Sequence, residues 1–256
     1  MIELKGVFAG YFGEAKIHDI HLTFHQGKIS AIVGPNGCGK TTLLKTAARL
    51  LTPMKGSVYL DKIDIAQMGL KAFVQRVALL PQTRLSINMR VENLVMHGRF
   101  PYAGFGRKPS QEDKNAVEKA LYLTKIESLR NKNISELSGG EKQRAYIAMA
   151  IAQDTEVFLL DEPMTHLDIC HQIDIGEILK ELNREGKTII MVLHDLAQAM
   201  TLADFVCVMR EGKVLCYAPP QEVYEGKYLQ KAFDVHCLKM EDKNQNVFYT
   251  FCKRQS

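Results

Sequence analysis

A chain of 256 residues, 46% of them hydrophobic, has enough apolar material to bury the core of one α/β domain with an appended subdomain. Its 33 Lys and Arg residues against 29 Asp and Glu residues leave a formal net charge of +4. Because the basic residues are scattered, the charge gives no reason to expect a nucleic-acid-binding protein. Apolar runs stay well short of the roughly 20 residues that span a bilayer, so any membrane role is expected to come through a partner chain.

The cysteines and the start of the chain indicate a cellular compartment. The six cysteines form neither a C-x-x-C pair nor a Cys/His ligand pattern. A zinc site or a disulfide framework is therefore not expected, and thiols in a reducing cytosol are favoured. Residues 1–6 lack the apolar stretch of a signal peptide, so we expect no secretory leader.

The first third of the chain alternates between apolar strand patterns and turns. A turn is expected at residues 11–13, and a glycine-rich turn follows residue 33. A helix is expected over about 41–51, stopped by Pro53. The expected strand segments are 2–22, 28–33, 56–60 and 77–80.

The middle of the chain changes to helical patterns. Residues 91–97 read as a helix, and residues 100–109 read as a loop rich in Gly, Pro and aromatic residues. Ser110 followed by Asp113 is a capping-box pattern, which predicts a helix over residues 111–123.

Strand patterns resume after this helical segment. The expected elements are strands at 157–160 and 188–193, a helix at 171–185 closed by Gly186, and a hairpin of 205–209 and 213–217 that turns at Glu211 and Gly212. Strand–helix alternation of this kind indicates a largely parallel sheet covered by helices. The tail after about His236 is weakly patterned, and no element is predicted there.

The segment after the strand at 28–33 fits G-x-x-x-x-G-K-[ST], the phosphate-binding loop between a strand and a helix. Its glycines let backbone N–H groups converge on phosphate oxygens, and the helix N-terminus adds its positive dipole end. Lys40 places a cation between the β- and γ-phosphates, and the Thr41 hydroxyl is suited to bind Mg²⁺. The pattern predicts a P-loop NTPase with nucleotide-binding residues Gly34, Pro35, Asn36, Gly37, Cys38, Gly39, Lys40, Thr41 and Thr42.

Cys38 lies inside this loop, at the helix N-terminus and near Lys40. Both the dipole and the ammonium group favour the thiolate, so one interpretation is a thiol with a depressed pKa that reacts readily. The other interpretation is an inert small side chain. The sequence does not choose between them.

Two acids, Asp161 and Glu162, follow the apolar strand 157–160. A buried strand would hold Asp161 rigidly near the metal, and Glu162 could polarise the attacking water as a general base. Solvated acids at a strand end are common in isolation. After a P-loop, and with Pro163 next, the catalytic interpretation is favoured.

Residues 137–144 read Leu-Ser-Gly-Gly-Glu-Lys-Gln-Arg, which resembles the LSGGQ-type signature of ABC ATPases. A serine and two glycines precede a helix whose free N–H groups can bind a γ-phosphate. The resemblance implies that Ser138, Gly139 and Gly140 contact the ATP held by another subunit. It therefore implies a head-to-tail dimer with two ATP molecules in its interface, an arrangement that closes on itself.

Other residues match motifs of this family in chain order. Tyr11 resembles the aromatic residue that stacks on adenine, with Phe12 as the alternative. Gln82 resembles the Q-loop glutamine, residues 166–168 resemble the D-loop, and His194 resembles the switch histidine that touches the γ-phosphate. The resemblance implies catalytic roles for Glu162, His194 and Gln82, and Mg²⁺ contacts from Thr41, Gln82 and Asp161.

Three positions depart from the family's usual residues. Thr41 replaces the commoner Ser and keeps the hydroxyl, and Cys38 replaces a frequent Ser of similar size. Met164 stands where Thr or Ser is usual, which puts part of the hydrogen bonding across the implied dimer interface in doubt. None of the three removes a catalytic group, so we expect an active ATPase.

The resemblance covers about residues 2–233 and implies the fold class. This is an α/β P-loop NTPase (RecA-like) core with a parallel sheet, an N-terminal antiparallel β region and an inserted α-helical subdomain. A single domain over 1–256 is expected, with a catalytic core at 1–83 and 152–235, a helical subdomain at about 84–151, and a tail at 236–256.

Within the family, the sequence is similar to ATPase subunits of bacterial importers for iron-siderophores, haem and cobalamin. The similarity rests on residues 91–94, 98–101, 194–199 and 220–223 and on the loop before Pro109. It implies an ATPase that drives uptake of a metal chelate, with iron-siderophore favoured, through a separate permease. Apolar candidates for contact with a cytoplasmic helix of that permease are Leu85, Ile87, Met89, Phe100, Tyr102 and Phe105, although a core role is favoured for Leu85 and Ile87.

The implied cofactors are ATP and Mg²⁺. The implied partners are a second ATPase subunit in a homodimer, transmembrane permease subunits and, indirectly, a substrate-binding protein, with no nucleic acid. The implied location is the cytoplasmic face of the cell membrane, as a peripheral subunit. The alternative is a permease-independent ABC ATPase such as an iron–sulfur assembly ATPase, which the middle segment fits less well. A soluble P-loop kinase or GTPase is disfavoured because such proteins lack the signature at 137–144.

Overall fold

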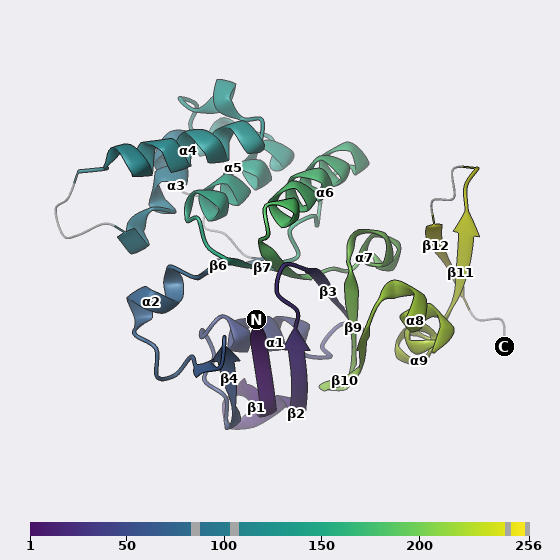
Figure 1. The fold of residues 1–256 in the computed structure, drawn as a ribbon. Coiled ribbons are helices and arrows are strands. Elements are labelled where there is room, and N and C mark those ends of the chain that lie inside the picture. Colours follow the sequence, from purple (N-terminus) through teal and green to yellow (C-terminus); the bar gives the residue numbers. More distant parts are fainter. Residues whose placement is uncertain (83–87, 103–107, 244–246, 254–256) are drawn as a thin grey trace. The chain divides into compact units, whose positions relative to one another are not determined.

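The computed structural model describes residues 1–82, 88–102, 108–243 and 247–253 (Figure 1). The chain divides into two compact units. The first unit combines Met1–Met68 with Thr188–Ser256, and the second comprises Gly69–Lys187.

An antiparallel sheet forms the start of the first unit. Its strand order is β2-β1-β4-β5, with β1 pairing β2 on one side and β4 on the other. Phe12 and Gly13 connect β1 to β2 with positive φ angles of 53° and 84°, the backbone conformation that closes a two-residue hairpin. The predicted turn is confirmed there. The strands are β1 (Ile2–Tyr11), β2 (Glu14–Phe24), β4 (Lys55–Leu60) and β5 (Ile63–Asp64).

The first unit also contains a run of strands in the order β10-β9-β3-β8. The strand β3 runs parallel to both β8 and β9, and every residue of β3 and β8 is buried. Strands covered on both faces need continuous apolar sequences, which is why these segments are rich in Ile and Val. The elements here are β3 (Ile29–Val33), α1 (Lys40–Ala47), β8 (Thr188–Val192), α7 (Leu196–Leu202), β9 (Phe205–Arg210) and β10 (Lys213–Ala218).

The helix α1 ends at Ala47, four residues before the predicted end at Leu51. Arg49 adopts φ 58°, its N–H donates to the carbonyl of Thr46, and the N–H of Leu50 donates to the carbonyl of Lys45. These two hydrogen bonds form a Schellman motif, which closes the helix before Pro53 is reached. The predicted length was therefore wrong by one turn.

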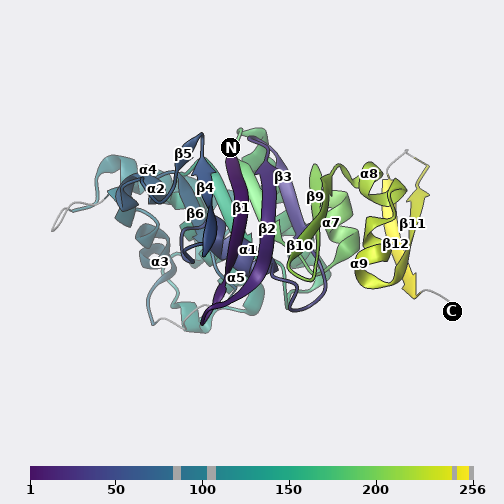
Figure 2. The same ribbon diagram turned by 90° about the horizontal axis from the view of Figure 1, so that it is seen from below.

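The end of the chain folds into elements that the sequence patterns did not predict. The strands β11 and β12 pair as an antiparallel hairpin, and Cys237 and Tyr249 are buried on one face of it. In Figure 2 the hairpin lies beside α8 and α9, and β11 contacts α9. The elements are α8 (Pro220–Glu225), α9 (Tyr228–Phe233), β11 (Val235–Glu241) and β12 (Val247–Lys253).

The second unit joins a pair of parallel strands to a group of helices. The strand β6 runs parallel to β7, with Leu80 opposite Leu160. The helices α3, α4 and α5 pack against one another (Figure 1). The predicted capping box at Ser110 and Asp113 is confirmed at the start of α4. The elements are α2 (Leu70–Val74), β6 (Val77–Leu80), α3 (Val91–His97), α4 (Gln111–Leu123), α5 (Gly139–Ala152), β7 (Val157–Asp161) and α6 (Ile169–Arg184), with single 3₁₀ turns at Phe100–Tyr102, Glu127–Leu129 and Ile134–Glu136.

The observed elements confirm the predicted fold class, an α/β protein with parallel strands, an antiparallel N-terminal region and a helical segment. The second unit is larger than the predicted subdomain at 84–151, because it also contains β6, β7 and α6. The division into a catalytic core and a subdomain at those boundaries stays a prediction.

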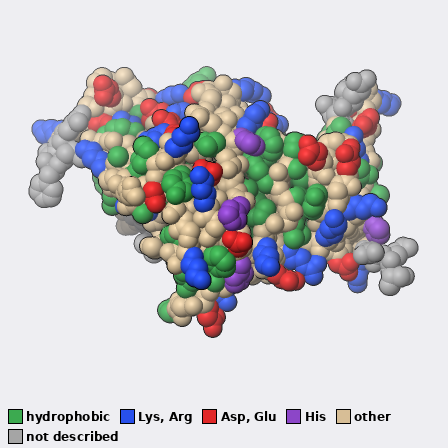
Figure 3. Space-filling model, turned by 60° about the horizontal axis from the view of Figure 1, so that its bottom comes forward, with side chains coloured by type: hydrophobic (Ala, Val, Ile, Leu, Met, Phe, Trp, Pro, Cys, Tyr) green, Lys and Arg blue, Asp and Glu red, His purple; other side chains and the backbone are tan. Residues whose placement is uncertain are grey.

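The surface mixes charges of both signs. Figure 3 shows Lys and Arg side chains interspersed with Asp and Glu on the face drawn, rather than collected into one band. Among the described residues, the helices are all too short or too polar to cross a membrane.

Candidate active site

Lys40 is the charged residue of the phosphate-binding loop. Its side chain is buried, and its ammonium group donates hydrogen bonds to the carbonyl oxygens of Gly34 at 2.7 Å and Pro35 at 3.1 Å. These contacts fold the long side chain back over the loop. The loop therefore holds a cation in place at the start of α1, where the helix dipole is also positive.

Two glycines of the loop are required by its shape. Gly39 has φ 102°, and a Cβ there would lie 2.6 Å from the Ile17 side chain. A Cβ on Gly34 would lie 2.5 Å from both the Cys38 sulfur and the carbonyl oxygen of Met209. A side chain at either position would displace the loop backbone. The predicted residues Asn36, Gly37, Thr41 and Thr42 complete the same loop and the first turn of α1.

Cys38 is buried against the loop, contrary to the reactive-thiol interpretation. Burial raises the pKa of its thiol, and this effect exceeds the opposing effect of the nearby Lys40 ammonium group. Of the two interpretations left open by the sequence, the depressed pKa is therefore wrong. The helix N-terminus and Lys40 are present as expected, but the thiol lies in low-dielectric surroundings that disfavour its charged form.

His194 and the P-loop follow neighbouring parallel strands. The P-loop follows β3 and His194 follows β8, and the N–H of Leu193 donates to the carbonyl of Ile32 at 3.1 Å. Because parallel strands end at the same edge of a sheet, His194 lies at the sheet edge that carries the loop. Its side chain is exposed, and Asp195 then caps α7 through the N–H of Gln198.

The two aromatic candidates for adenine stacking lie at the β1–β2 turn. Tyr11 is the last residue of β1 and is 38% exposed, whereas Phe12 is fully exposed in the turn itself. Both rings are accessible to a ligand. The assignment of Tyr11 stays a prediction.

In the second unit, Glu162 has a defined set of partners. Its Oε2 accepts hydrogen bonds from Gln82 Nε2 at 2.7 Å and from the Thr165 hydroxyl at 3.2 Å. Gln82 follows β6, and Asp161 ends the neighbouring parallel strand β7, so both groups lie at the same sheet edge. Asp161 is buried and Glu162 is only 9% exposed. A carboxylate held in this way is oriented for proton transfer.

The signature segment begins α5 with a capping box. The Ser138 hydroxyl accepts from the N–H of Glu141, and the Glu141 carboxylate accepts from the N–H of Ser138 at 2.8 Å. The hydrogen bond from the Ser138 backbone is the main cause that lowers the pKa of Glu141. The N–H groups of Gly139 and Gly140 lie in the first turn, where an α-helix provides no backbone acceptor.

The signature helix is tied to the loop that follows Glu162. The Gln143 side chain donates to the carbonyl of Pro163, and the Arg144 guanidinium pairs with Asp174 of α6 at 3.2 Å. Met164, the departure noted in the D-loop, is buried, so its side chain packs inside the protein. Asp168 caps α6 by accepting from the N–H of His171.

The sequence-predicted residues fall into two groups. The P-loop, Tyr11 and His194 belong to the first unit, and Gln82, Asp161, Glu162 and the signature residues belong to the second. Sequence reasoning missed Thr165 and His171. The sequence signal for each was its spacing: Thr165 lies three positions after Glu162, and His171 lies three positions after the cap residue Asp168. A residue three positions after a turn or cap residue returns to the same side of the backbone.

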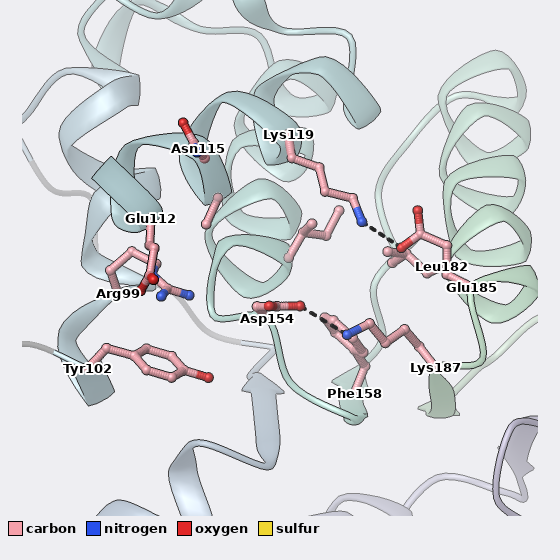
Figure 4. Close-up of a pocket in the computed structure, with 12 residues that line it drawn as sticks. Arg99, Tyr102, Glu112, Asn115, Lys119, Asp154, Phe158, Leu182, Glu185 and Lys187 are labelled. Atoms are coloured by element: carbon pink, nitrogen blue, oxygen red, sulfur yellow. Dashed lines mark hydrogen bonds and ion pairs between the residues drawn. The ribbon is translucent and has the colours of Figure 1, made fainter. Parts of the chain in front are cut away.

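A cavity of about 510 Å³ opens elsewhere in the second unit, between α4 and the ends of α5 and α6. Figure 4 shows two ion pairs in it, Lys119 with Glu185 at 2.7 Å and Lys187 with Asp154 at 3.0 Å. The described residues that line it include none of the predicted nucleotide-site residues. Four of its charged side chains form these two pairs.

Comparison with known proteins identifies the family. The family model described as ABC transporter matches residues 17–165. The chain belongs to the ABC transporter family. It is 41% identical over 94% of its length to the "Probable siderophore transport system ATP-binding protein YusV" of Bacillus subtilis, covering 88% of that protein. It is also 41% identical over 91% of its length to the "Ferric enterobactin transport ATP-binding protein FepC" of Escherichia coli, covering 87% of that protein.

A solved structure supports the same assignment. The ATP-binding cassette MJ0796, described as a dimeric post-hydrolysis state bound to ADP and Pi, is 27% identical with a TM-score of 0.75. The match covers 86% of this chain and 99% of that one. ATP-binding subunits of this family hydrolyse ATP to power transport, so this ABC protein is an ATP-binding ATPase subunit.

Proposed function

We propose that this ABC subunit uses Glu162 as the general base for ATP hydrolysis and drives uptake of an iron-siderophore through a separate permease. The observation that carries the catalytic part is the double hydrogen bond to Glu162 from Gln82 and Thr165. The Gln82 amide and the Thr165 hydroxyl both donate to Oε2, and these two hydrogen bonds fix the orientation of the carboxylate. The base is therefore oriented before the nucleotide reaction begins.

The P-loop supports nucleotide binding in this proposal. The buried Lys40 supplies charge for the β- and γ-phosphates, and the loop N–H groups supply hydrogen bonds. Tyr11 or Phe12 offers a ring face to adenine, which favours a purine without reading its edge. His194 completes the group that would contact the γ-phosphate.

The donor atoms predicted to bind Mg²⁺ suit that ion. The Thr41 hydroxyl, the Asp161 carboxylate and the Gln82 amide oxygen are hard oxygen ligands, which Mg²⁺ prefers. Gln82 uses its nitrogen to reach Glu162, so its oxygen is the atom that would serve as a ligand. When bound, Mg²⁺ would neutralise charge on the phosphates of ATP.

The dimeric arrangement is part of the proposal. We infer that Ser138, Gly139 and Gly140 bind the terminal phosphate of ATP held by a second copy. The first-turn N–H groups of α5 and the open space beside Gly139 support this role.

The proposed cargo is inferred from the named relatives, and the proposed permease contact is inferred from exposed apolar side chains. The named relatives are ATP-binding proteins of siderophore systems, which supports an iron-siderophore over the permease-independent alternative. Phe100 is 62% exposed and is the best of the described candidates for contact with a permease helix, with Met89 and Tyr102 half-buried. The other three candidates, Leu85, Ile87 and Phe105, lie outside the described residues. We infer a peripheral location at the cytoplasmic membrane face and an indirect link to a substrate-binding protein.

The catalytic proposal is tested with Glu162→Gln. The variant should keep ATP affinity, lose hydrolysis by about 10²- to 10⁴-fold, and accumulate an ATP-bound dimer visible by light scattering. Glu177→Gln is the matched control, because Glu177 is an exposed carboxylate on α6 paired only locally with Lys180. Normal hydrolysis by Glu162→Gln would disprove the base assignment.

The transport proposal is tested by purification from detergent-solubilised membranes. The tagged chain should co-purify with a multi-span permease, and mass spectrometry of the complex should detect a bound ferric chelate. Recovery with soluble iron–sulfur assembly proteins instead would favour the permease-independent alternative.

A further inference from the structure

His171 joins the two segments of the second unit that carry the D-loop and the signature motif. It is the third residue of α6, and its ring Nδ1 lies 2.8 Å from Asp168 Oδ2. Asp168 also accepts the N–H of His171 through its other oxygen at 2.9 Å. The carboxylate therefore holds both the backbone and the ring of the same residue.

The far side of this ring rests on Gly140, the second glycine of the signature motif. A Cβ built on Gly140 would lie 2.2 Å from His171 Cδ2 and 2.6 Å from Nε2. No side chain fits between them, so the imidazole packs directly on the Gly140 backbone. By contrast, a Cβ on Gly139 would meet open space. The ring supports one face of the helix start and leaves the other face accessible.

We propose that His171 is a positioning residue that sets the Gly140 backbone for phosphate binding, with Asp168 holding the ring in place. The inference rests on the proposed function, because it assumes that the signature N–H groups bind the partner's ATP. The His171 side chain is only 29% exposed. Asp168 accepts one hydrogen bond from the ring Nδ1 and one from the backbone N–H of His171, which limits the movement of the ring. A movement of Asp168 in the D-loop is thereby transmitted to Gly140 of the signature motif through the His171 imidazole.

The contacts around His171 bear on whether another described bond could hold the start of α5 in its place. Two other bonds between described residues join these segments, Gln143 with Pro163 and Arg144 with Asp174, and both lie further along α5. They hold the helix body but do not reach Gly140. Loss of the His171 ring should therefore leave α5 folded and free only its first turn.

The test measures ATP-dependent dimerisation in the Glu162→Gln background, with MgATP as the ligand. His171→Ala should weaken the dimer by about 10- to 100-fold, the loss that follows a misplacement near 1 Å in a binding group. ATP binding by the monomer, measured with a fluorescent ATP analogue, should change less than about twofold because the P-loop is in the other unit. His171→Asn keeps a donor for Asp168 without the ring and should be as defective as His171→Ala.

A double-mutant cycle separates positioning from general damage. Gly140→Ala alone should abolish dimerisation, because its methyl group collides with the ring. Adding His171→Ala to Gly140→Ala removes the collision and should recover part of the dimer, so the two effects are not additive. The control is His21→Ala, because His21 also pairs with an aspartate, Asp19, but is 68% exposed on β2. It should dimerise like the parent.

These experiments distinguish failure of the His171 inference from failure of the proposed function. If His171→Asn dimerises like the parent, or if the Gly140 and His171 effects simply add, the ring does not act through Gly140 and the inference is wrong. If the Glu162→Gln parent itself forms no ATP-dependent dimer, the proposed function fails and the inference fails with it. Thermal unfolding of each variant shows that a lost dimer is not a lost fold.

Discussion

Glu162 adopts a left-handed backbone conformation, φ 54°, directly after the last residue of β7. For a residue with a side chain this conformation costs of order 1 kcal/mol. The side chain then reaches both Gln82 and Thr165, and these hydrogen bonds offset the cost. The strained backbone is thus coupled to the position of the proposed base.

The reactivity of the Cys38 sulfur tests whether the thiol is buried in solution. Burial raises the pKa of its thiol, so the reactive thiolate is scarce at neutral pH and the sulfur is inaccessible. Maleimide at pH 7 should label Cys38 at least about tenfold more slowly than the exposed Cys170 and Cys252, as measured by peptide mass spectrometry. Equal labelling would mean that the loop opens readily in solution.

At the scale of elements, α4 is anchored by one buried pair. Arg99 Nε donates to Asp113 Oδ1 at 3.0 Å, and the same guanidinium donates to the carbonyl of Ala152 at the end of α5. Asp113 also accepts from the backbone and hydroxyl of Ser110. One carboxylate therefore links the start of α4 to the segment before it and to α5.

This pair predicts a pH dependence. Burial by itself raises the pKa of Asp113, but hydrogen bonds from Ser110 and Arg99 outweigh it and lower the pKa to about 2. A depressed carboxyl pKa stabilises the fold above the unfolded value near 4, and this stabilisation is lost as pH falls toward about 2. Asp113→Asn should lower the free energy of unfolding by about 2 kcal/mol at pH 7.

The difference between Asp113→Asn and the unchanged protein should shrink steadily between about pH 4 and pH 2, as measured by denaturant unfolding. The control is Glu177→Gln, which removes an exposed helical ion pair and should change stability by less than about 1 kcal/mol. A constant difference across this pH range would contradict the role given to the Asp113 charge.

At the scale of the whole molecule, the residues proposed to act on ATP are divided between the two compact units. The phosphate-binding loop belongs to one unit, and the proposed base and signature belong to the other. Nucleotide binding and hydrolysis therefore depend on different parts of the chain. Substitutions in the P-loop and at Glu162 should separate these two steps.

MgATP should stabilise the whole protein against heat. A ligand at 100 times its dissociation constant adds about 2.7 kcal/mol to the free energy of unfolding if it binds only the folded state. Glu162→Gln should keep this shift in a thermal-melt measurement, whereas Lys40→Ala should lose most of it because the loop cation is gone. A full shift in Lys40→Ala would show that ATP binds elsewhere.

Features that depend on neighbours in the sequence could be read without a structure. The P-loop spacing, the acids after an apolar strand, the Ser110 and Asp113 cap and the hairpin turn at Glu211 and Gly212 are all of this kind. Each rests on local backbone geometry or on hydrogen bonds that span a few residues. The largely parallel sheet covered by helices followed because these local patterns alternate in order along the chain. The antiparallel region and the helical subdomain were implied by the family resemblance.

Other features required the tertiary structure, because they depend on what distant segments bring together. The burial of Cys38 reversed the direction of its pKa shift, and Gln82 reaches Glu162 from the segment after β6, 80 positions away in the sequence. The C-terminal hairpin was not predicted from its weak pattern, because its buried face forms only against α7, α8 and α9. Dielectric environment and side-chain packing are properties of the assembled fold, and no local pattern encodes them.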